Sequence, residues 1–136
     1  MTLLNYKFDH IALRVSDIKI STKFYIDVLN FQKGRNFYSS NGVTEIQYLH
    51  RDDIILELTS RATKLKKFSN KYDAAEIKHL AFSIEGISKY YSSLSHQGVI
   101  PSPIKTKKLE QNTFSYFFIF DPDGIKIEFI AHGPKA

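Results

Sequence analysis

Hydrophobic and polar residues alternate along this chain with two different periods. Stretches with a period of two are typical of strands with one face in a core, and stretches with a period near 3.6 are typical of amphipathic helices. In order, the pattern predicts a strand, a helix, three strands and a basic linker, and then the same order again. The predicted strands are 8–15, 32–39, 43–50, 53–60, 77–84, 113–120 and 124–131, and 104–109 is compatible with either a strand or a loop. The predicted helices are 17–30 and 87–97, and the linker is 61–75.

The first predicted helix has a recognisable start and an apolar stripe. Ser16 or Asp17 can cap its N-terminus, because both side chains accept hydrogen bonds from free backbone N–H groups. Ile20, Phe24 and Val28 recur at a spacing of one helical turn. We therefore expect this stripe to pack against the sheet.

The second half of the chain repeats the first at two places. Residues 9–13 (Asp-His-Ile-Ala-Leu) match 78–82 (Lys-His-Leu-Ala-Phe), and residues 55–58 (Ile-Leu-Glu-Leu) match 126–129 (Lys-Ile-Glu-Phe). One short insertion accounts for the small difference in spacing between the two matches. Because such self-similarity marks repeated structural units, the sequence predicts two copies of one βαβββ module.

The predicted architecture is an α+β fold in which the two modules form a cupped mixed β-sheet with the helices on its outer face. At 136 residues, the chain has the size of one ordinary domain and can bury a core without disulfides. The predicted boundaries are 1–136 for the single domain, 6–60 for the first module, 61–75 for the linker and 76–132 for the second module.

Four polar residues interrupt the apolar pattern at equivalent places in the two modules: His10, Glu57, His79 and Glu128. Successive side chains of a strand point to opposite faces, so all four fall on the row that faces away from the helices. Any one of them alone would be read as a solvent-facing residue. Glutamate is depleted in strands and costly to bury unpaired. Two histidines and two glutamates at repeat-related positions therefore favour a shared ligand set. The other histidines are expected at the surface or rim: His50, His96 and His132.

Two imidazoles and two carboxylates around a divalent ion would make a nearly neutral site. Since the chain has no cysteine, any metal must take nitrogen and oxygen ligands. Such ligands suit nickel, zinc, cobalt, manganese or iron(II), and octahedral coordination would leave two positions for water or substrate. The sequence therefore predicts an open metal site, as catalysis requires.

The formal net charge of +5 is compatible with nucleic acid, an acidic membrane or a small anionic substrate. The aromatic strand 113–120 lacks the interleaved basic residues of a base-stacking surface, and neither nucleic acid nor membrane is an expected partner. No apolar stretch spans a bilayer and the first residues lack a signal-peptide pattern, which predicts a cytoplasmic location. The basic residues gather in two segments that read as loops: Arg61, Lys64, Lys66, Lys67 and Lys71, and then Lys105, Lys107 and Lys108.

Several segments together form a known pattern. They are 9–17 (Asp-His-Ile-Ala-Leu-Arg-Val-Ser-Asp), 24–25, 28–29, 55–58, 79–83, and 121–124 (Asp-Pro-Asp-Gly) leading to Glu128. In these the chain resembles the vicinal oxygen chelate superfamily, which includes glyoxalase I, methylmalonyl-CoA epimerase, extradiol dioxygenases, and fosfomycin and bleomycin resistance proteins. The resemblance covers nearly the whole chain, and the set His, Glu, His, Glu is similar to that of bacterial glyoxalase I.

The resemblance implies a metal-dependent isomerisation of the lactoylglutathione lyase type. The metal would bind the substrate oxygens and stabilise an enediolate while a carboxylate moves the proton. Glu128 is the predicted base, with Glu57 as the alternative, and Arg14 matches a substrate-contacting position that follows the first histidine. The expected cofactor is a divalent metal ion, and a thiol such as glutathione is a candidate co-substrate.

Two other functions remain open at the level of sequence. An extradiol dioxygenase-like enzyme would need only His10, His79 and Glu128 as ligands. A non-catalytic, resistance-type protein would bind a small molecule against aromatic residues that could equally belong to the sheet core: Tyr48, Phe114, Tyr116 and Phe118. In every case the expected partner is a small molecule, and the net charge is compatible with an anionic one. A homodimer is expected, with the modules paired either within one chain or between two chains.

Overall fold

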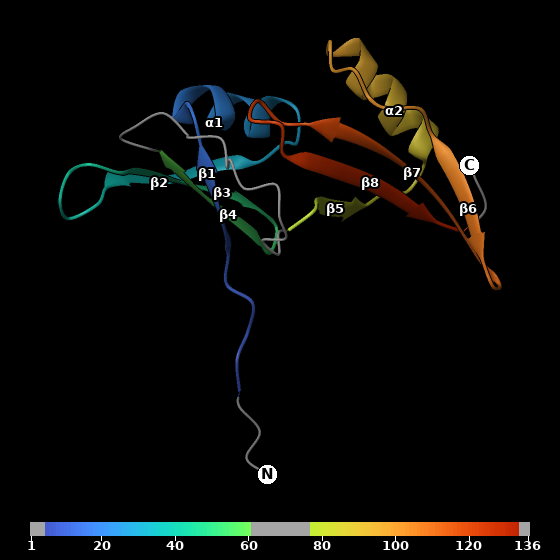
Figure 1. Cartoon of the computed structure of the whole chain (residues 1–136), viewed down its shortest axis with the longest axis horizontal. Helices are drawn as coiled ribbons and strands as arrows, with labels where there is room; N and C mark the ends of the chain where they lie inside the picture. Colours follow the sequence, from blue (N-terminus) through green and yellow to red (C-terminus); the bar gives the residue numbers. More distant parts are fainter. Residues whose placement is uncertain (1–4, 61–76, 134–136) are drawn as a thin grey trace, which may run out of the picture. The chain divides into compact units, whose positions relative to one another are not determined.

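The computed structural model describes residues 5–60 and 77–133. The chain divides into two compact units, Met1–Ser69 and Asn70–Ala136. In each unit the described residues run in the order strand, helix, three strands (Figure 1). The predicted α+β class and the doubled βαβββ module are confirmed, whereas the predicted linker 61–75 lies outside the described residues.

The two units have the same sheet topology. In each, the first strand pairs in parallel with the last, and the remaining pairs are antiparallel. The sheet orders are β1-β4-β3-β2 and β5-β8-β7-β6. The elements of the first unit are β1 (Ile11–Val15), α1 (Ile18–Asp27), β2 (Gln32–Tyr38), β3 (Glu45–Arg51) and β4 (Ile54–Ser60). Those of the second are β5 (Leu80–Ser83), α2 (Ile87–His96), β6 (Lys105–Leu109), β7 (Asn112–Phe120) and β8 (Lys126–His132).

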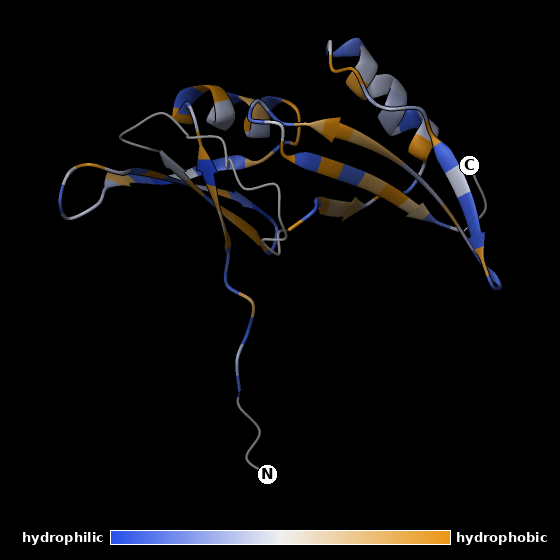
Figure 2. Cartoon of the chain, viewed as in Figure 1, coloured by the Kyte–Doolittle hydropathy of each residue, from blue (hydrophilic) through white to orange (hydrophobic). Residues whose placement is uncertain are grey.

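The core of each unit lies between its helix and one face of its sheet. Alternate residues of β4 and β8 are buried on this face, and the residues between them are only partly buried. Figure 2 shows the corresponding bands of apolar and polar residues along β8. The largest fully buried side chains include Tyr25, Leu56 and Leu58 in the first unit, and Phe117, Ile119 and Ile127 in the second. The glutamates of β4 and β8 therefore lie on the opposite face of each sheet, away from the helix.

Helix α1 begins where the sequence predicts but packs through another face. Asp17 is the N-cap, and its carboxylate accepts hydrogen bonds from the backbone N–H groups of Lys19 and Ile20. The predicted apolar stripe is wrong, since Ile20 is 56% exposed. The buried residues are Ile18, Ser21, Thr22 and Tyr25. Two of these four side chains are polar, so a search for an apolar stripe does not find this face.

Two further expectations need correction. The segment with Lys105, Lys107 and Lys108 is not a loop, because it forms the exposed edge strand β6. Lysines on an edge strand discourage pairing with another chain. The first strand of each unit is also shorter than predicted, so that His10 and His79 each stand one residue before β1 and β5.

The Asp-Pro-Asp-Gly segment shapes the turn between β7 and β8. The Asp121 carboxylate is 5% exposed and accepts hydrogen bonds from the backbone N–H groups of Asp123 and Ile125. Gly124 has a φ of 84°, a conformation that favours glycine. The motif thus sets the geometry of the turn that joins β7 to its antiparallel partner β8. In the described ranges, no helix is long and apolar enough to cross a membrane.

Candidate metal centre

A histidine and a glutamate come together in each unit. His10 stands at the entry to β1, and Glu57 lies in β4, in register with Ala12 of β1. In the second unit Glu128 of β8 is in register with Ala81 of β5, and His79 stands at the entry to β5. The parallel pairing of the outer strand with its neighbour therefore brings each predicted histidine beside its predicted glutamate.

The two pairs have nearly the same geometry. His10 Nε2 lies 2.9 Å from Glu57 Oε2, and His79 Nε2 lies 3.0 Å from Glu128 Oε2. Two ligands at right angles about a metal, each bonded at about 2.1 Å, are separated by about 3.0 Å. The side chains of Glu57 and Glu128 are only 17% and 13% exposed, so each carboxylate requires a compensating partner. The spacing and the donor atoms both fit adjacent ligands of one divalent ion.

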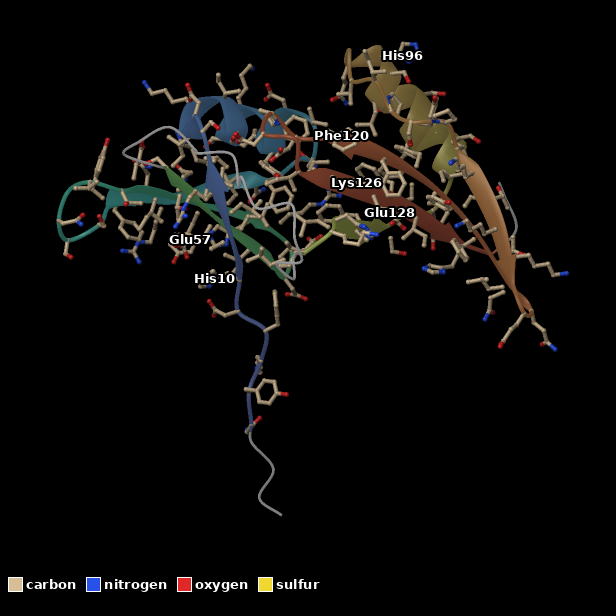
Figure 3. The ribbon with its side chains drawn as sticks, in the orientation of Figure 1. His10, Glu57, His96, Phe120, Lys126 and Glu128 are labelled. Carbon is tan, nitrogen blue, oxygen red and sulfur yellow. The ribbon has the colours of Figure 1, made fainter. Side chains whose placement is uncertain are left out.

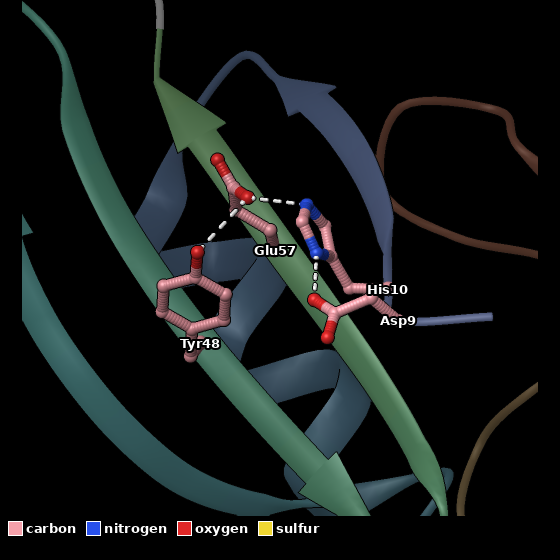
Figure 4. Close-up of polar contacts among 4 residues, drawn as sticks. All are labelled: Asp9, His10, Tyr48 and Glu57. Carbon is pink, nitrogen blue, oxygen red and sulfur yellow. Dashed lines mark hydrogen bonds and ion pairs between the residues drawn. The ribbon is translucent and has the colours of Figure 1, made fainter. Parts of the chain in front are cut away.

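Asp9 orients the first histidine from behind. Its Oδ2 lies 2.6 Å from His10 Nδ1, so that the ring is held between two carboxylates (Figure 4). This hydrogen bond, opposed by desolvation and assisted by the charge of Glu57, raises the pKa of His10 above 6.5. The proton on Nε2 occupies the place that a metal would take. A carboxylate on the far nitrogen is also the usual way in which proteins fix a metal-binding imidazole.

The pH dependence of the metal-free protein tests this arrangement. Because the folded state raises the pKa of His10, its protonated form stabilises the fold below pH 6.5, and this contribution is lost as the pH rises through the raised value. We expect Asp9→Asn, which removes the largest cause, to lower the pKa that NMR titration of the His10 ring reports. The loss of thermal stability above pH 6.5 should become smaller as well. Equal titration midpoints in the two proteins would contradict this account.

Tyr48 is a neighbour of the first pair that the sequence interpretation did not assign to it. Its hydroxyl donates a hydrogen bond of 3.2 Å to Glu57 Oε2 (Figure 4), and its ring meets that of His10 edge-on, with centroids 6.0 Å apart. Burial, with the nearby charge of Glu57, raises the pKa of Tyr48 above 10. The phenol therefore remains a hydrogen-bond donor at neutral pH.

The second pair has a different neighbour. Phe118 of β7 is in register with Glu128, and its ring lies 6.0 Å from that of His79. Lys126 projects from β8 on the same face as Glu128 (Figure 3). Its ammonium lies 3.8 Å from the centre of the Phe118 ring. A cation and an aromatic surface thus adjoin the second pair.

The remaining predicted residues lie on the same faces as the pairs. Arg14 is exposed in β1, in register with Thr59, two positions beyond the Ala12–Glu57 level. His50, His96 and His132 are exposed, as predicted. The four aromatic residues lie on the faces opposite the helices rather than in the helix-packed core, with Tyr116 9% exposed and the others partly buried: Tyr48, Phe114, Tyr116 and Phe118.

Each pair offers two donor atoms. Within residues 5–60 and 77–133, no group of three or more histidine, aspartate or glutamate side chains is arranged to hold a metal ion. Asp9 contacts Nδ1 of His10, on the side of the ring away from Glu57. It therefore orients the ring and does not add a third metal-ligand atom beside Nε2. The predicted set of four ligands therefore requires one pair from each module.

This topology and these residues agree with comparisons to known proteins. The chain matches the profile of the Glyoxalase/Bleomycin resistance protein/Dioxygenase superfamily over residues 7–129. It belongs to this superfamily. The matched region includes both histidines and both glutamates, and the family's name describes proteins that act on or bind small molecules.

Individual relatives extend over most of the chain. The uncharacterized protein YwkD of Bacillus subtilis is 30% identical over 120 residues, which cover 88% of this chain and 91% of YwkD. A probable lactoylglutathione lyase of Synechocystis is 27% identical over 135 residues, covering 93% and 95%. Their match over nearly full length indicates that both modules are shared.

Solved structures share the fold. A glyoxalase family protein from Enterococcus faecalis superposes with a TM-score of 0.76 at 24% identity, covering 93% of this chain and 97% of that one. The fosfomycin resistance protein FosX of Listeria monocytogenes, solved with manganese(II) and sulfate, superposes with a TM-score of 0.65 at 16% identity, covering 96% and 95%. These likenesses establish the same architecture.

Proposed function

We propose that this protein is a divalent-metal-dependent isomerase of the glyoxalase I type. The observation that carries the proposal is the repeated His–Glu pair, with nitrogen–oxygen separations of 2.9 and 3.0 Å in the two modules. A relative described as a probable lactoylglutathione lyase, similar over 93% of this chain, supports the same reaction class. The proposed substrate is the hemithioacetal of a 2-oxoaldehyde and a thiol such as glutathione.

The proposed ligands are His10, Glu57, His79 and Glu128. The two carboxylates offset the charge of a divalent ion, and nitrogen and oxygen donors suit nickel, zinc, cobalt, manganese or iron(II). When bound, such an ion would supply Lewis-acid stabilisation of negative charge on substrate oxygens. Manganese(II) in FosX, a protein of the same fold, supports this choice of cofactor.

The protein's own side chains would carry the proton. Glu128 would take the proton from the carbon that bears the hydroxyl group and the sulfur and return it to the neighbouring carbonyl carbon, so the substrate is isomerised without a second reactant. Glu128 is partly buried in strand β8, with its carboxylate 3.0 Å from His79 Nε2, and a positioned carboxylate is a common general base. Glu57 is the alternative base.

Positive charge near the pairs supports an anionic substrate. Arg14 lies on the face of Glu57 and Lys126 on the face of Glu128. A carboxylate of the thiol part of the substrate is a suitable partner for either cation. The protein is also proposed to act as a homodimer, in which the modules pair within one chain or between chains.

Metal content is the experiment that tests the proposal. We expect protein purified without chelators or an affinity tag to contain about one equivalent of nickel, zinc, manganese or iron by mass spectrometry, and His79→Ala and Glu128→Gln to contain less, because each removes a ligand. The reloaded protein should then isomerise a hemithioacetal of methylglyoxal and glutathione. Metal without turnover would support a dioxygenase-like enzyme. No metal after reloading with each ion would favour a non-catalytic binding protein.

A further inference from the structure

The two His–Glu pairs differ in the residue that faces the glutamate across the antiparallel strand pair. Tyr48 faces Glu57 between β3 and β4, and Phe118 faces Glu128 between β7 and β8. The rings occupy equivalent places, since each meets its histidine with centroids 6.0 Å apart. At this position the two half-sites therefore differ by one hydroxyl group.

The hydroxyl of Tyr48 is held in a defined place. It donates to Glu57 Oε2, the same oxygen that contacts His10. The Tyr48 ring stacks on Phe37 and on His50, with centroids 5.9 and 6.5 Å apart. His50 in turn lies against Gly34, where an added Cβ would be 2.6 Å from the imidazole. Rings on both sides thus fix the donor that orients the Glu57 carboxylate.

Strand β2, next to this stack of rings, has an irregular backbone that is hydrogen-bonded to a buried side chain. The register of β2 against β3 shifts between Lys33 and Asn36, which places Gly34 beside the His50 ring. The buried amide of Gln47 donates to the carbonyl oxygens of Gly34, Arg35 and Tyr48. The carbonyls of Gly34 and Arg35 lie where the register shifts, so a buried amide that satisfies them stabilises this irregularity.

Within residues 5–60 and 77–133, the Glu128 carboxylate has no hydroxyl donor that corresponds to Tyr48. Phe118 offers no hydroxyl, and the ammonium of Lys126 is placed over the Phe118 ring at 3.8 Å. Among the residues that the structure describes, the ion pair with His79 is the polar side-chain contact that Glu128 makes. With fewer hydrogen bonds to its oxygens, this carboxylate has more freedom to rotate than Glu57.

We propose that Tyr48 is a positioning residue that keeps Glu57 a fixed metal ligand, while Phe118 leaves Glu128 free to exchange between ligand and base. The inference rests on the proposed metal-dependent isomerase. It assigns different roles to two glutamates that the repeat makes equivalent. The proton leaves one substrate carbon for the Glu128 carboxylate and returns to the next carbon, so no further reactant is consumed.

Exchanging the two residues tests the inference. The variants are Tyr48→Phe, Phe118→Tyr and the double exchange, with Tyr38→Phe as control, because Tyr38 belongs to the same sheet and is 60% exposed. Chelator-treated proteins are titrated with Co²⁺, and affinity and visible absorption are recorded. We expect Tyr48→Phe to weaken Co²⁺ binding by about tenfold or more, as removal of an outer hydrogen bond to a ligand does. Its apo-protein melting temperature should match that of Tyr38→Phe.

Phe118→Tyr should act in the opposite direction. The added hydroxyl would hold Glu128, so Co²⁺ binding is unchanged or tighter while kcat for the hemithioacetal falls by about tenfold at saturating metal, with KM unchanged. If the wild-type protein binds Co²⁺ and both exchanges leave affinity, spectrum and kcat as they were, the positioning role is wrong and the metal site stands. If the wild-type protein binds no Co²⁺, the proposed function fails, and the inference with it.

Discussion

Glu128→Gln is expected to lower kcat of the metal-saturated protein for hemithioacetal isomerisation by about 10³-fold, within the range found when a general base is removed. Glutamine keeps the size of the side chain and one oxygen donor, but its amide cannot accept the substrate proton at neutral pH. The measurement is steady-state kinetics at a metal concentration that saturates each variant. Because saturation is reached first, a lower metal affinity cannot produce the loss.

Glu57→Gln is the matched comparison. Both carboxylates lie about the same distance from their histidine, 2.9 and 3.0 Å, so both substitutions disturb a ligand in the same way. If Glu57 serves as a ligand alone, its variant should need more metal but keep most of kcat once saturated. Equal losses in the two variants would mean that the glutamates share the proton transfer, and a larger loss in Glu57→Gln would assign the base to Glu57.

Much of the fold could be predicted because alternation and repetition are properties of the sequence itself. A strand with one buried face must alternate, and β4 and β8 do so with a glutamate at the same step. The comparison of the two halves then selected His10, Glu57, His79 and Glu128 without knowledge of any contact. The structure places each histidine beside the glutamate of its own module.

What the sequence interpretation missed concerns packing and cross-strand register. Helix α1 buries Ser21 and Thr22 and exposes Ile20, so its buried face includes polar side chains that a search for an apolar stripe does not find. Tyr48 escaped a search for matched residues because its counterpart is Phe118. A signal was present nonetheless: the turn at Asp52 and Asp53 pairs Arg51 with Ile54, and counting outward from it leads to Tyr48 opposite Glu57.

Asp9, whose carboxylate orients His10, is a second residue that the comparison of the two halves does not select. Its counterpart in the repeat is Lys78, so a comparison of the halves gives it no weight. Its position next to His10 is visible in the sequence, but the contact with Nδ1 depends on the rotamer of both side chains. Differences between the modules, rather than their identities, therefore identify the residues that distinguish the two half-sites.

Metal binding is expected to raise the melting temperature of the chelator-treated protein by roughly 10 °C when free Co²⁺ is about 100 times Kd. Binding to the folded state alone contributes about 2.7 kcal/mol at that ratio, and each kcal/mol moves the midpoint by about 4 °C for a chain of this size. The shift should disappear in His10→Ala and equally in His79→Ala. His96→Ala is the control, since that exposed imidazole lies on α2, away from the sheet (Figure 3).

The equality of the two histidine variants is the decisive part of this experiment. If each module held its own ion through one His–Glu pair, either substitution would remove half of the bound metal and leave part of the shift. If one ion needs both pairs, either substitution removes donors from the same ion and the whole shift is lost. In a dimer that joins half-sites of different chains, mixing His10→Ala with His79→Ala would restore one intact site in each mixed dimer, and with it part of the shift. Failure of that mixture would favour pairing within one chain.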